Sequence, residues 1–332
     1  MWRSALAGSI AAGYSFFRVG MRLSGVSKFE ISIGDSYNER RIGIHSQEGI
    51  FVSERKLFVD YDQYENGVQI VDLIEKLADS GESLQLDSLT IGDWGGAYEN
   101  DSSPVVEALV RLKDRFPQLR SLFIGDMSYE ECEVSWINQS NIGPILAAYP
   151  ELKSLTIKGS TGLSLDPASH DKLEELVIIC GGLGKEVIAS ISEGSFKSLK
   201  KLELYLGVED YGFDGSLEDI LPLIEPGKFP QLTYLGLKDS EIQDEIAIAV
   251  ANAPIVDQLH TLDFSMGTLS DQGAEALLQS EKIKKLEFLN LSHHFMSDKM
   301  MKRWQQSGIN VDISEHQGDA DEEDYRYPSL TE

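Results

Sequence analysis

The sequence has little cysteine, few basic residues and no long uninterrupted apolar run. Cys132 and Cys180 are the two cysteines among 332 residues, and neither lies in a CxxC motif or a Cys/His ligand cluster. So few cysteines exclude a disulfide framework or a zinc-ligand pattern. They are typical of reduced thiols in the cytosol, so we expect a cytoplasmic protein.

Basic residues are scarce in comparison with acidic ones. The chain has 29 Lys and Arg against 55 Asp and Glu, which gives a formal net charge of −26. An acidic field repels phosphate backbones, so the composition argues against a nucleic-acid partner. It favours a basic protein or peptide, or a metal cation. The alternative, that the acidity only confers solubility, stays open.

The first apolar stretch is "SALAGSIAAGYSFFRVG", residues 4–20. Ser and Gly dilute it and Arg18 interrupts it, so it is too weak for a membrane span, and no convincing cleavage site follows. We therefore expect no membrane association. A poor export leader, an organellar presequence, or an over-extended gene start with initiation at Met21 all remain possible. We favour the last, and expect residues 1–28 to lie outside the fold.

The pattern Leu-x-x-Leu-x-Leu, with Ile or Phe allowed at the last position, occurs eight times. The first residues of the eight copies are Leu86, Leu119, Leu152, Leu173, Leu199, Leu232, Leu259 and Leu286. The intervals between them run from 21 to 33 residues. Periods of this size indicate a solenoid in which each copy contributes one strand with inward apolar residues, followed by a covering helix.

This array resembles a leucine-rich repeat protein. Its last two copies, with "LSDQGAEALL" from Leu269 and "MSDKMMKRW" from Met296, resemble the ribonuclease-inhibitor-like subclass. The resemblance implies an α/β horseshoe with parallel strands on the concave face and helices on the convex face. The usual Asn of the repeat is absent, since its position holds Trp94, Met127, Ser160, Gly181, Gly207, Ser240, Gly267 and His294. The loop backbone must then be held by other bonds.

The remaining segments flank the array, which we place at residues 84–314. Residues 29–83 contain "FEISIGD", "RRIGIH" and "KLFVDYD", which are strand-like, and an amphipathic helix, so we expect an N-terminal α/β cap. Helix starts are expected at Ser103-Pro104, Ser216, Ser270 and Ser297. Residues 315–332 form an acidic tail that we expect to be disordered or loosely docked.

Side chains that alternate with the inward residues should face the concave surface. The predicted partner-binding residues on this surface are Phe123, Lys158, Glu175, Val177, Ile179, Lys201, Glu203, Tyr205, Tyr234, Lys238 and Phe288. Tyrosines flanked by charge are typical of interface centres. Two alternatives stay open. Helix or tail residues cover the patch, with the tail across Lys158, Lys201 and Lys238, or β-propensity alone selected these residues.

A second candidate site follows the strands, where Ile-Gly-Asp recurs at an interval of 33 residues, ending at Asp93 and Asp126. Residues at the same phase of adjacent repeats line up, so the two carboxylates should occupy neighbouring positions at one edge. The predicted loop-rim residues are Asp93, Trp94, Tyr98, Asp126, Tyr129, Glu130, Tyr211 and His293. Neighbouring carboxylates need a partner. A divalent cation at Asp93, Asp126, Glu130 and Glu131 is one possibility, and backbone N–H groups of the next loop are the other.

The sequence offers little support for catalysis, and we predict neither a cofactor nor a metal site. "CGGLGK" at Cys180 fails the Walker pattern, because it lacks the first glycine and the final Ser or Thr. Cys180 and His170 have no orienting group. His293 and His294 are expected to be an inert pair on a solvated loop.

Three stretches, "IGDWGGAYENDSSPVVEAL", "IGDMSYEECEVSWINQS" and "YRYPSLTE", resemble a bacterial family of single-domain leucine-rich repeat proteins. Members are often encoded beside radical-SAM, ATP-grasp and hydrolase-like proteins. The resemblance implies a cytoplasmic scaffold for enzymes encoded nearby, without catalytic residues. We therefore expect a non-enzymatic protein- or peptide-binding module. The alternatives are a cation-dependent or catalytic site at the loop edge, and an inhibitor or immunity protein for a basic partner, the latter by fold analogy alone.

Overall fold

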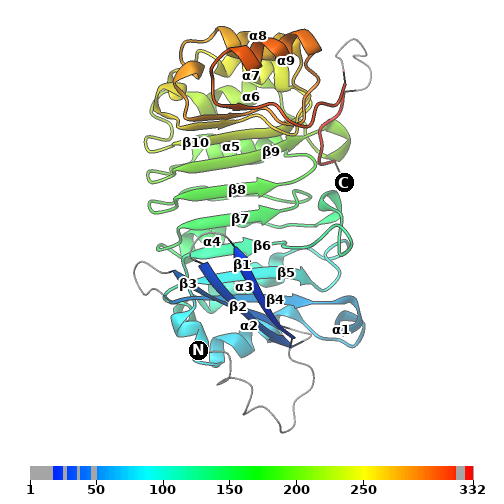
Figure 1. Cartoon of the computed structure of the whole chain (residues 1–332). Helices are drawn as coiled ribbons and strands as arrows, with labels where there is room; N and C mark the ends of the chain where they lie inside the picture. Colours follow the sequence, from blue (N-terminus) through cyan, green and yellow to red (C-terminus); the bar gives the residue numbers. More distant parts are fainter. Residues whose placement is uncertain (1–17, 25–27, 36–37, 46–50, 319–325, 332) are drawn as a thin grey trace, which may run out of the picture.

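The strands of the protein form one continuous curved sheet. The computed structural model describes residues 18–24, 28–35, 38–45, 51–318 and 326–331. Over these residues the sheet has 13 strands whose spatial order equals their order in the sequence (Figure 1). The strands are β1 Arg18–Ser24, β2 Lys28–Asp35, β3 Asn38–His45, β4 Phe51–Val59, β5 Ser88–Trp94, β6 Ser121–Ile124, β7 Ser154–Lys158, β8 Glu175–Ile179, β9 Lys201–Gly207, β10 Tyr234–Ser240, β11 Thr261–Asp263, β12 Phe288–Asn290 and β13 Val311–Asp312.

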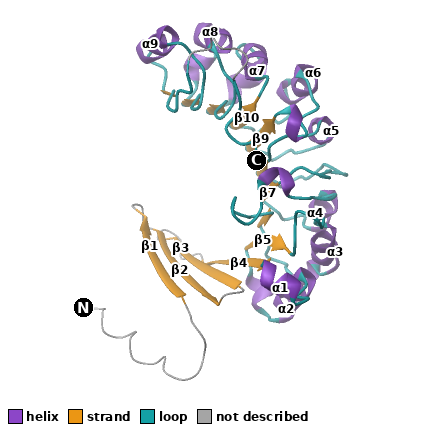
Figure 2. Cartoon of the chain, turned by 90° about the vertical axis from the view of Figure 1, so that its right-hand side faces the viewer, coloured by secondary structure: helices purple, strands orange, loops and turns teal. Residues whose placement is uncertain are grey.

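The sheet changes character at β4. Strands β1 to β4 pair antiparallel as hairpins, whereas every pair from β4 to β13 is parallel. Each parallel connection returns over one face of the sheet, so the helices gather on the outer side of the curve (Figure 2). The helices are α1 Tyr61–Glu65, α2 Ile70–Asp79, α3 Ser103–Arg111, α4 Gly143–Ala148, α5 Lys185–Glu193, α6 Leu217–Ile220, α7 Gln243–Val250, α8 Asp271–Gln279 and α9 Asp298–Gln306. The predicted α/β parallel-sheet solenoid is confirmed.

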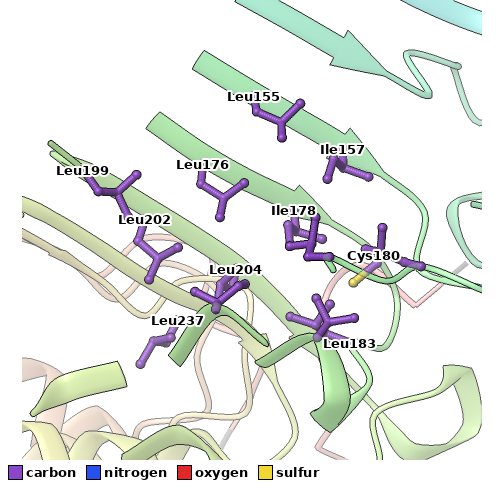
Figure 3. Packing of buried hydrophobic residues seen from close by; sticks show 14 of the residues in the cluster. Leu155, Ile157, Leu176, Ile178, Cys180, Leu183, Leu199, Leu202, Leu204 and Leu237 are labelled. Atoms are coloured by element: carbon purple, nitrogen blue, oxygen red, sulfur yellow. The ribbon is translucent and has the colours of Figure 1, made fainter. Parts of the chain in front are cut away.

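The core lies between the sheet and the helices and is built from the inward residues of the repeat. Leu155 and Ile157, and likewise Leu176 and Ile178, are fully buried and stack on their neighbours from strand to strand (Figure 3). Burying one such side chain stabilises the fold by about 1.5–3 kcal/mol, so stability accumulates along the stack. Among the described residues, no helix has the length and apolarity needed to cross a membrane.

Different polar groups replace the missing Asn from one repeat to the next. His294 Nδ1 accepts the Met296 N–H (3.2 Å), so Nε2 carries the proton and donates to the Ile313 carbonyl (3.0 Å). Ser160 donates its hydroxyl to the Gly182 carbonyl (2.6 Å). Gly207, at φ 75°, lies against the Gly181 carbonyl with no room for a Cβ. The loops are therefore fastened individually rather than by one side-chain ladder.

Several predicted boundaries require correction. Strand β1, Arg18–Ser24, pairs with β2, so the boundary that we placed at residue 28 has to move toward the N-terminus. Residues 1–17, which include the start of the suspected leader, lie outside the described residues. Ser103 is not the cap of α3 but its first residue, and Asp101 accepts the Ser103 N–H (2.8 Å). Ser216, Ser270 and Ser297 are N-cap residues as predicted.

Candidate functional site

The predicted partner-binding residues lie on the concave face, on strands β6 to β10 and β12. The strand register aligns Val177 with Glu203, Glu203 with Gly236, and Gly236 with Asp263. One rung further along, Tyr205 pairs with Lys238. The sheet therefore brings charged and aromatic side chains of β9, β10 and β11 into one cluster, which we call the concave network. Its members are Lys201, Glu203, Tyr205, Tyr234, Lys238 and Asp263.

Lys238 is the centre of the concave network. Its Nζ lies 3.2 Å from Glu203 Oε1, 3.1 Å from Tyr205 Oη and 3.9 Å from Asp263 Oδ2. Tyr234 donates its hydroxyl to Asp263 Oδ2 (2.7 Å). Lys201 Nζ pairs with Glu203 Oε2 (2.8 Å). Two lysines thus balance two carboxylates, and the tyrosine hydroxyls complete the hydrogen bonding.

The aromatic rings and a glycine shape this network. Lys201 Nζ lies 4.9 Å from the ring centroid of Tyr234, and Lys238 Nζ lies 4.6 Å from that of Tyr205, which are cation–π distances. A Cβ on Gly236 would approach Glu203 Cγ and Tyr234 Cε1 to 3.2 Å each. The absence of a side chain at Gly236 therefore leaves the space in which the charges meet.

Burial and neighbouring charges together fix the protonation states of the network. Glu203, Lys238 and Asp263 are buried, although they lie on the concave side of the sheet. Burial opposes the charge of Lys238, yet Asp263, Tyr205 and Glu203 outweigh it and raise its pKa to about 12. Burial also raises the pKa of Tyr205 and Tyr234. At neutral pH the lysine is a cation and the tyrosines are neutral, so the tyrosines act as hydrogen-bonding groups and not as bases.

The other predicted concave residues surround the network without joining it. Val177 and Ile179 of β8 are half-exposed and lie on the strand beside β9. Glu175 is exposed and accepts the Ser154 hydroxyl (3.2 Å). Phe123 on β6 is half-buried and separated from the network by β7 and β8. Phe288 is also half-buried but lies on β12, directly beside β11, where it pairs with Thr261. Val177 and Ile179 therefore extend the network with apolar side chains on the β8 side.

Lys158 belongs with the loop edge rather than with the concave centre. Its Nζ donates to the Met127 carbonyl (2.5 Å). Burial lowers the pKa of Lys158, while Asp126 and Glu131 counteract this effect. Lys158 therefore does not belong to the cluster that contains Lys201 and Lys238.

The carboxylates of Asp93 and Asp126 have separate partners. Asp93 accepts the N–H groups of Gly95 (2.8 Å) and Ala97 (3.1 Å), within its own loop and not the next one. Burial raises the pKa of Asp93 in spite of these bonds. Asp126 pairs with Lys56 Nζ (2.9 Å), and its N–H donates to the Ile91 carbonyl (3.0 Å). Within the part of the chain that the structure describes, no group of three or more His, Cys, Asp or Glu side chains is arranged to hold a metal.

Two predicted rim residues are buried. Trp94 is a core residue whose Nε1 donates to the Asn100 carbonyl (2.8 Å), so its assignment to the rim is wrong. His293 and His294 are also buried, which contradicts a solvated pair. His293 Nε2 lies 3.2 Å from the Tyr327 carbonyl, and burial lowers the pKa of His294. Tyr98, Tyr129 and Glu130 are exposed, as a rim site requires, and Tyr211 is half-exposed.

The end of the chain, Arg326–Thr331, is bound to the loop edge, and we call it the docked segment. The Leu330 N–H donates to Asp239 Oδ1 (2.8 Å) and the Ser329 N–H to the Met266 carbonyl (2.7 Å). Arg326 pairs with Asp244 (3.0 Å). Figure 1 shows this end of the chain beside the loops that follow the strands. It therefore does not lie across Lys201 and Lys238. Of the two expectations for the tail, docking and not disorder applies to these residues.

Asp244 and Gly236 were not predicted as site residues. Asp239 is fully buried at a positive φ of 54°, and burial raises its pKa to about 7. Among the residues that the structure describes, its Oδ2 has no hydrogen-bond partner. Only Gly236 could have been recognised from the sequence, because this glycine interrupts the row of side chains between Glu203 and Asp263.

Comparison with solved structures finds a relative that matches along almost the whole chain. The crystal structure of a Bacteroides fragilis protein, determined by the Northeast Structural Genomics Consortium, aligns with a TM-score of 0.77 and 31% identity, covering 96% of this chain and 100% of that chain. The chain belongs to the family of that Bacteroides fragilis protein. No protein-family model matches the sequence, and no curated protein is similar to it.

Thiol chemistry is suppressed in this member of the Bacteroides fragilis family. Cys180 is fully buried and donates its Sγ–H to the Tyr205 carbonyl (3.2 Å), and burial raises its pKa to about 12. Burial likewise raises the pKa of Cys132 to about 11. The thiolate is the reactive form of cysteine, so neither side chain is suited to nucleophilic attack at neutral pH.

Proposed function

We propose that the protein is a non-enzymatic recognition module, which holds a protein or peptide segment against its concave face. We also propose that it is a leucine-rich repeat protein of the ribonuclease-inhibitor-like subclass. The observation that carries the function is the concave network beside the half-exposed Val177 and Ile179. Such a surface combines an apolar contact with tyrosines and charges in fixed positions.

The fixed positions favour binding because they reduce its entropic cost. Ordering a mobile side chain at an interface costs about 0.5–1.5 kcal/mol. Lys238 and Asp263 are already held by internal bonds, and the cation–π contacts of Lys201 and Lys238 hold the tyrosine rings. A partner that packs on Val177, Ile179 and the exposed edges of Tyr205 and Tyr234 meets a preorganised surface.

The chemistry of these groups favours binding over catalysis. The carboxylates of the concave network are engaged by lysines and a tyrosine hydroxyl, and the tyrosines are held neutral. A general base needs a pKa near the working pH and access to a substrate proton. The cation-dependent alternative at the loop edge gains no support, because Asp93 and Asp126 are satisfied by backbone N–H groups and by Lys56.

The proposal is tested with a random peptide library displayed on phage and panned against the purified chain. Enriched peptides should bind at least about tenfold more weakly to a Val177→Glu/Ile179→Glu variant, because buried charge at an interface centre is strongly unfavourable. The matched control is Leu221→Glu/Ile248→Glu, which adds the same charge at exposed apolar residues away from the concave strands. Enrichment that survives the concave variant, or no enrichment, contradicts a concave binding site.

A further inference from the structure

Exposed aromatic side chains lie on α1 of the N-terminal cap and at the loop edge of the first two repeats. Tyr61 is 65% exposed, Tyr98 44%, Tyr129 61% and Trp136 60%. They make up half of the large apolar side chains that are exposed on the described residues. We call these four residues the aromatic edge. Clustered, solvent-exposed aromatic rings indicate contact surfaces more often than scattered aliphatic residues do.

The aromatic edge comes from three neighbouring segments. Helix α1 carries Tyr61, the loop after β5 carries Tyr98, and the loop after β6 carries Tyr129 and Trp136. Asn100 donates to Tyr64 Oη (3.1 Å), which joins α1 to the first loop, and the Asn138 N–H donates to the Ala97 carbonyl (2.9 Å), which joins the two loops. Figure 1 shows α1 and these loops on the same side of the sheet.

The loops are held rigidly, so the exposure of the rings does not come from a loose segment. Gly95 and Gly96 have positive φ, and both lie against the ring of Tyr64. The buried Trp94 fastens the same loop through the Asn100 carbonyl, and Asp93 accepts its N–H groups. The second loop is closed by the Ser128 N–H, which donates to Glu131 Oε2 (2.6 Å). Rigid aromatic side chains lose little entropy on binding.

Carboxylates without a lysine or arginine partner surround the aromatic edge. These carboxylates are Asp62, Glu65, Glu99, Glu130, Glu131 and Glu133. Among the described residues, no Lys or Arg forms an ion pair with any of the six. Two nearby lysines are engaged elsewhere, Lys56 by Asp126 and Lys158 by the Met127 carbonyl. The pKa of Tyr98 is raised, mainly by the charge of Glu99 and further by burial and by Tyr61 and Tyr64. Helix α1, Tyr98 and Glu99 therefore lie close enough to interact electrostatically.

The opposite edge of the same sheet, before the strands, shows the contrasting arrangement. Glu174 pairs there with Lys153 (2.5 Å) and Lys200 (2.7 Å). Glu151 pairs with Lys172 and lies 3.4 Å from Arg120. Glu174 and Glu151 are thus neutralised, whereas the six carboxylates around the aromatic edge are not, so the open charge is not a uniform property of this acidic chain.

We propose that the aromatic edge, with its surrounding carboxylates, binds an arginine- and lysine-rich segment of a partner protein. Arginine fits best, because its planar guanidinium stacks on aromatic rings and pairs with carboxylates through two hydrogen bonds. Charge complementarity selects this occupant over an apolar or acidic one. The aromatic edge is separate from the concave network, so either site can fail without the other.

The test measures the fluorescence anisotropy of a labelled Arg-Gly-Arg-Gly-Arg-Gly-Arg peptide, titrated with the full chain at physiological salt. We expect this arginine peptide to bind more tightly than its lysine counterpart. The glutamate counterpart should not bind. A Glu99→Gln/Glu130→Gln/Glu133→Gln variant should bind about tenfold more weakly, because it removes three charges at the site. The matched control, Glu186→Gln/Glu193→Gln/Glu218→Gln, removes three exposed charges on α5 and α6 and should change the affinity less than about twofold.

The aromatic contribution is tested with Tyr98→Ala/Trp136→Ala, which keeps the charge and should weaken binding about fivefold. Ile248→Ala, at an exposed residue of α7, is its control. Equal losses in the loop-edge and control triple variants would mean attraction by net charge alone and would overturn the proposal. So would no saturable binding, or binding insensitive to Tyr98 and Trp136. The Val177→Glu/Ile179→Glu variant should bind the arginine peptide normally, which separates this site from the concave one.

Discussion

The two tyrosines of the concave network differ in the direction of their hydrogen bonds. Tyr234 is the donor to a buried carboxylate, Asp263, whereas Tyr205 accepts a hydrogen bond from Lys238. Lys238 has further partners in Glu203 and Asp263. The hydroxyl of Tyr234 is therefore more difficult to replace than that of Tyr205.

Tyr234→Phe should lower the free energy of unfolding by about 1–3 kcal/mol, since it removes a hydrogen bond to a buried carboxylate. Tyr205→Phe should cost clearly less, because Lys238 retains both carboxylates. Urea unfolding of the two variants, at equal m-values, provides the comparison. Equal costs, or a larger cost for Tyr205→Phe, would mean that the network is not organised around these donors and acceptors.

The residues that sequence reasoning placed correctly are those whose position follows from strand alternation. Tyr205, Tyr234 and Lys238 face the concave side because they alternate with the inward leucines. Trp94 and His293 were misplaced, because loop residues after a strand have no such periodicity. Whether a loop side chain turns inward depends on contacts distant in the sequence, such as that of His293 with Tyr327.

At the scale of elements, the docked segment depends on Asp239. Its carboxyl is buried beneath Leu330 and Ser329, and burial raises its pKa to about 7, although both N–H groups and Lys238 act in the opposite direction. The folded-state pKa lies above the ordinary value of 3.8, so the fold favours the protonated form. The stability that this group contributes is therefore present below about pH 4 and is lost as pH rises through about 7.

Asp239→Asn should abolish this part of the pH dependence. Asn keeps an acceptor for the Leu330 N–H and tolerates the positive φ of 54°. The variant should melt at a higher temperature than the unmodified chain at pH 8 and at nearly the same temperature at pH 4. The difference between the two melting curves isolates Asp239 from the other titrating groups. A difference that is constant across this range would contradict the assigned role of its burial.

Some helices and strands were predicted close to their observed bounds and others were not, and the difference has physical reasons. Hydrophobic periodicity predicted β2, β3 and α2 close to their observed bounds. Strand β1 was missed because its residues were placed outside the fold, and its pairing with β2 cannot be recognised from β1 alone. The place where the docked segment binds was not predicted, because its partners, Asp244 and Asp239, are 82 and 91 residues away in the sequence.

At the scale of the whole molecule, the parallel register turns separate repeats into two continuous surfaces. One is the concave face, where adjacent strands bring Lys201, Tyr234 and Lys238 together. The other is the loop edge, where aromatic side chains are exposed at one end and the docked segment is bound at the other. The relationship to the Bacteroides fragilis protein extends over the whole array, so both surfaces lie within the shared fold.

The central claim, that the concave face is the binding surface, is tested most directly by photo-crosslinking. A peptide selected by panning is given a photoreactive residue at each position in turn, and the attachment sites on the chain are mapped by mass spectrometry. The account predicts attachment on β8, β9 and β10, at or beside Val177, Ile179 and Tyr205, and its loss in Val177→Glu/Ile179→Glu. Attachment mainly on the convex helices α5 to α8 would contradict it.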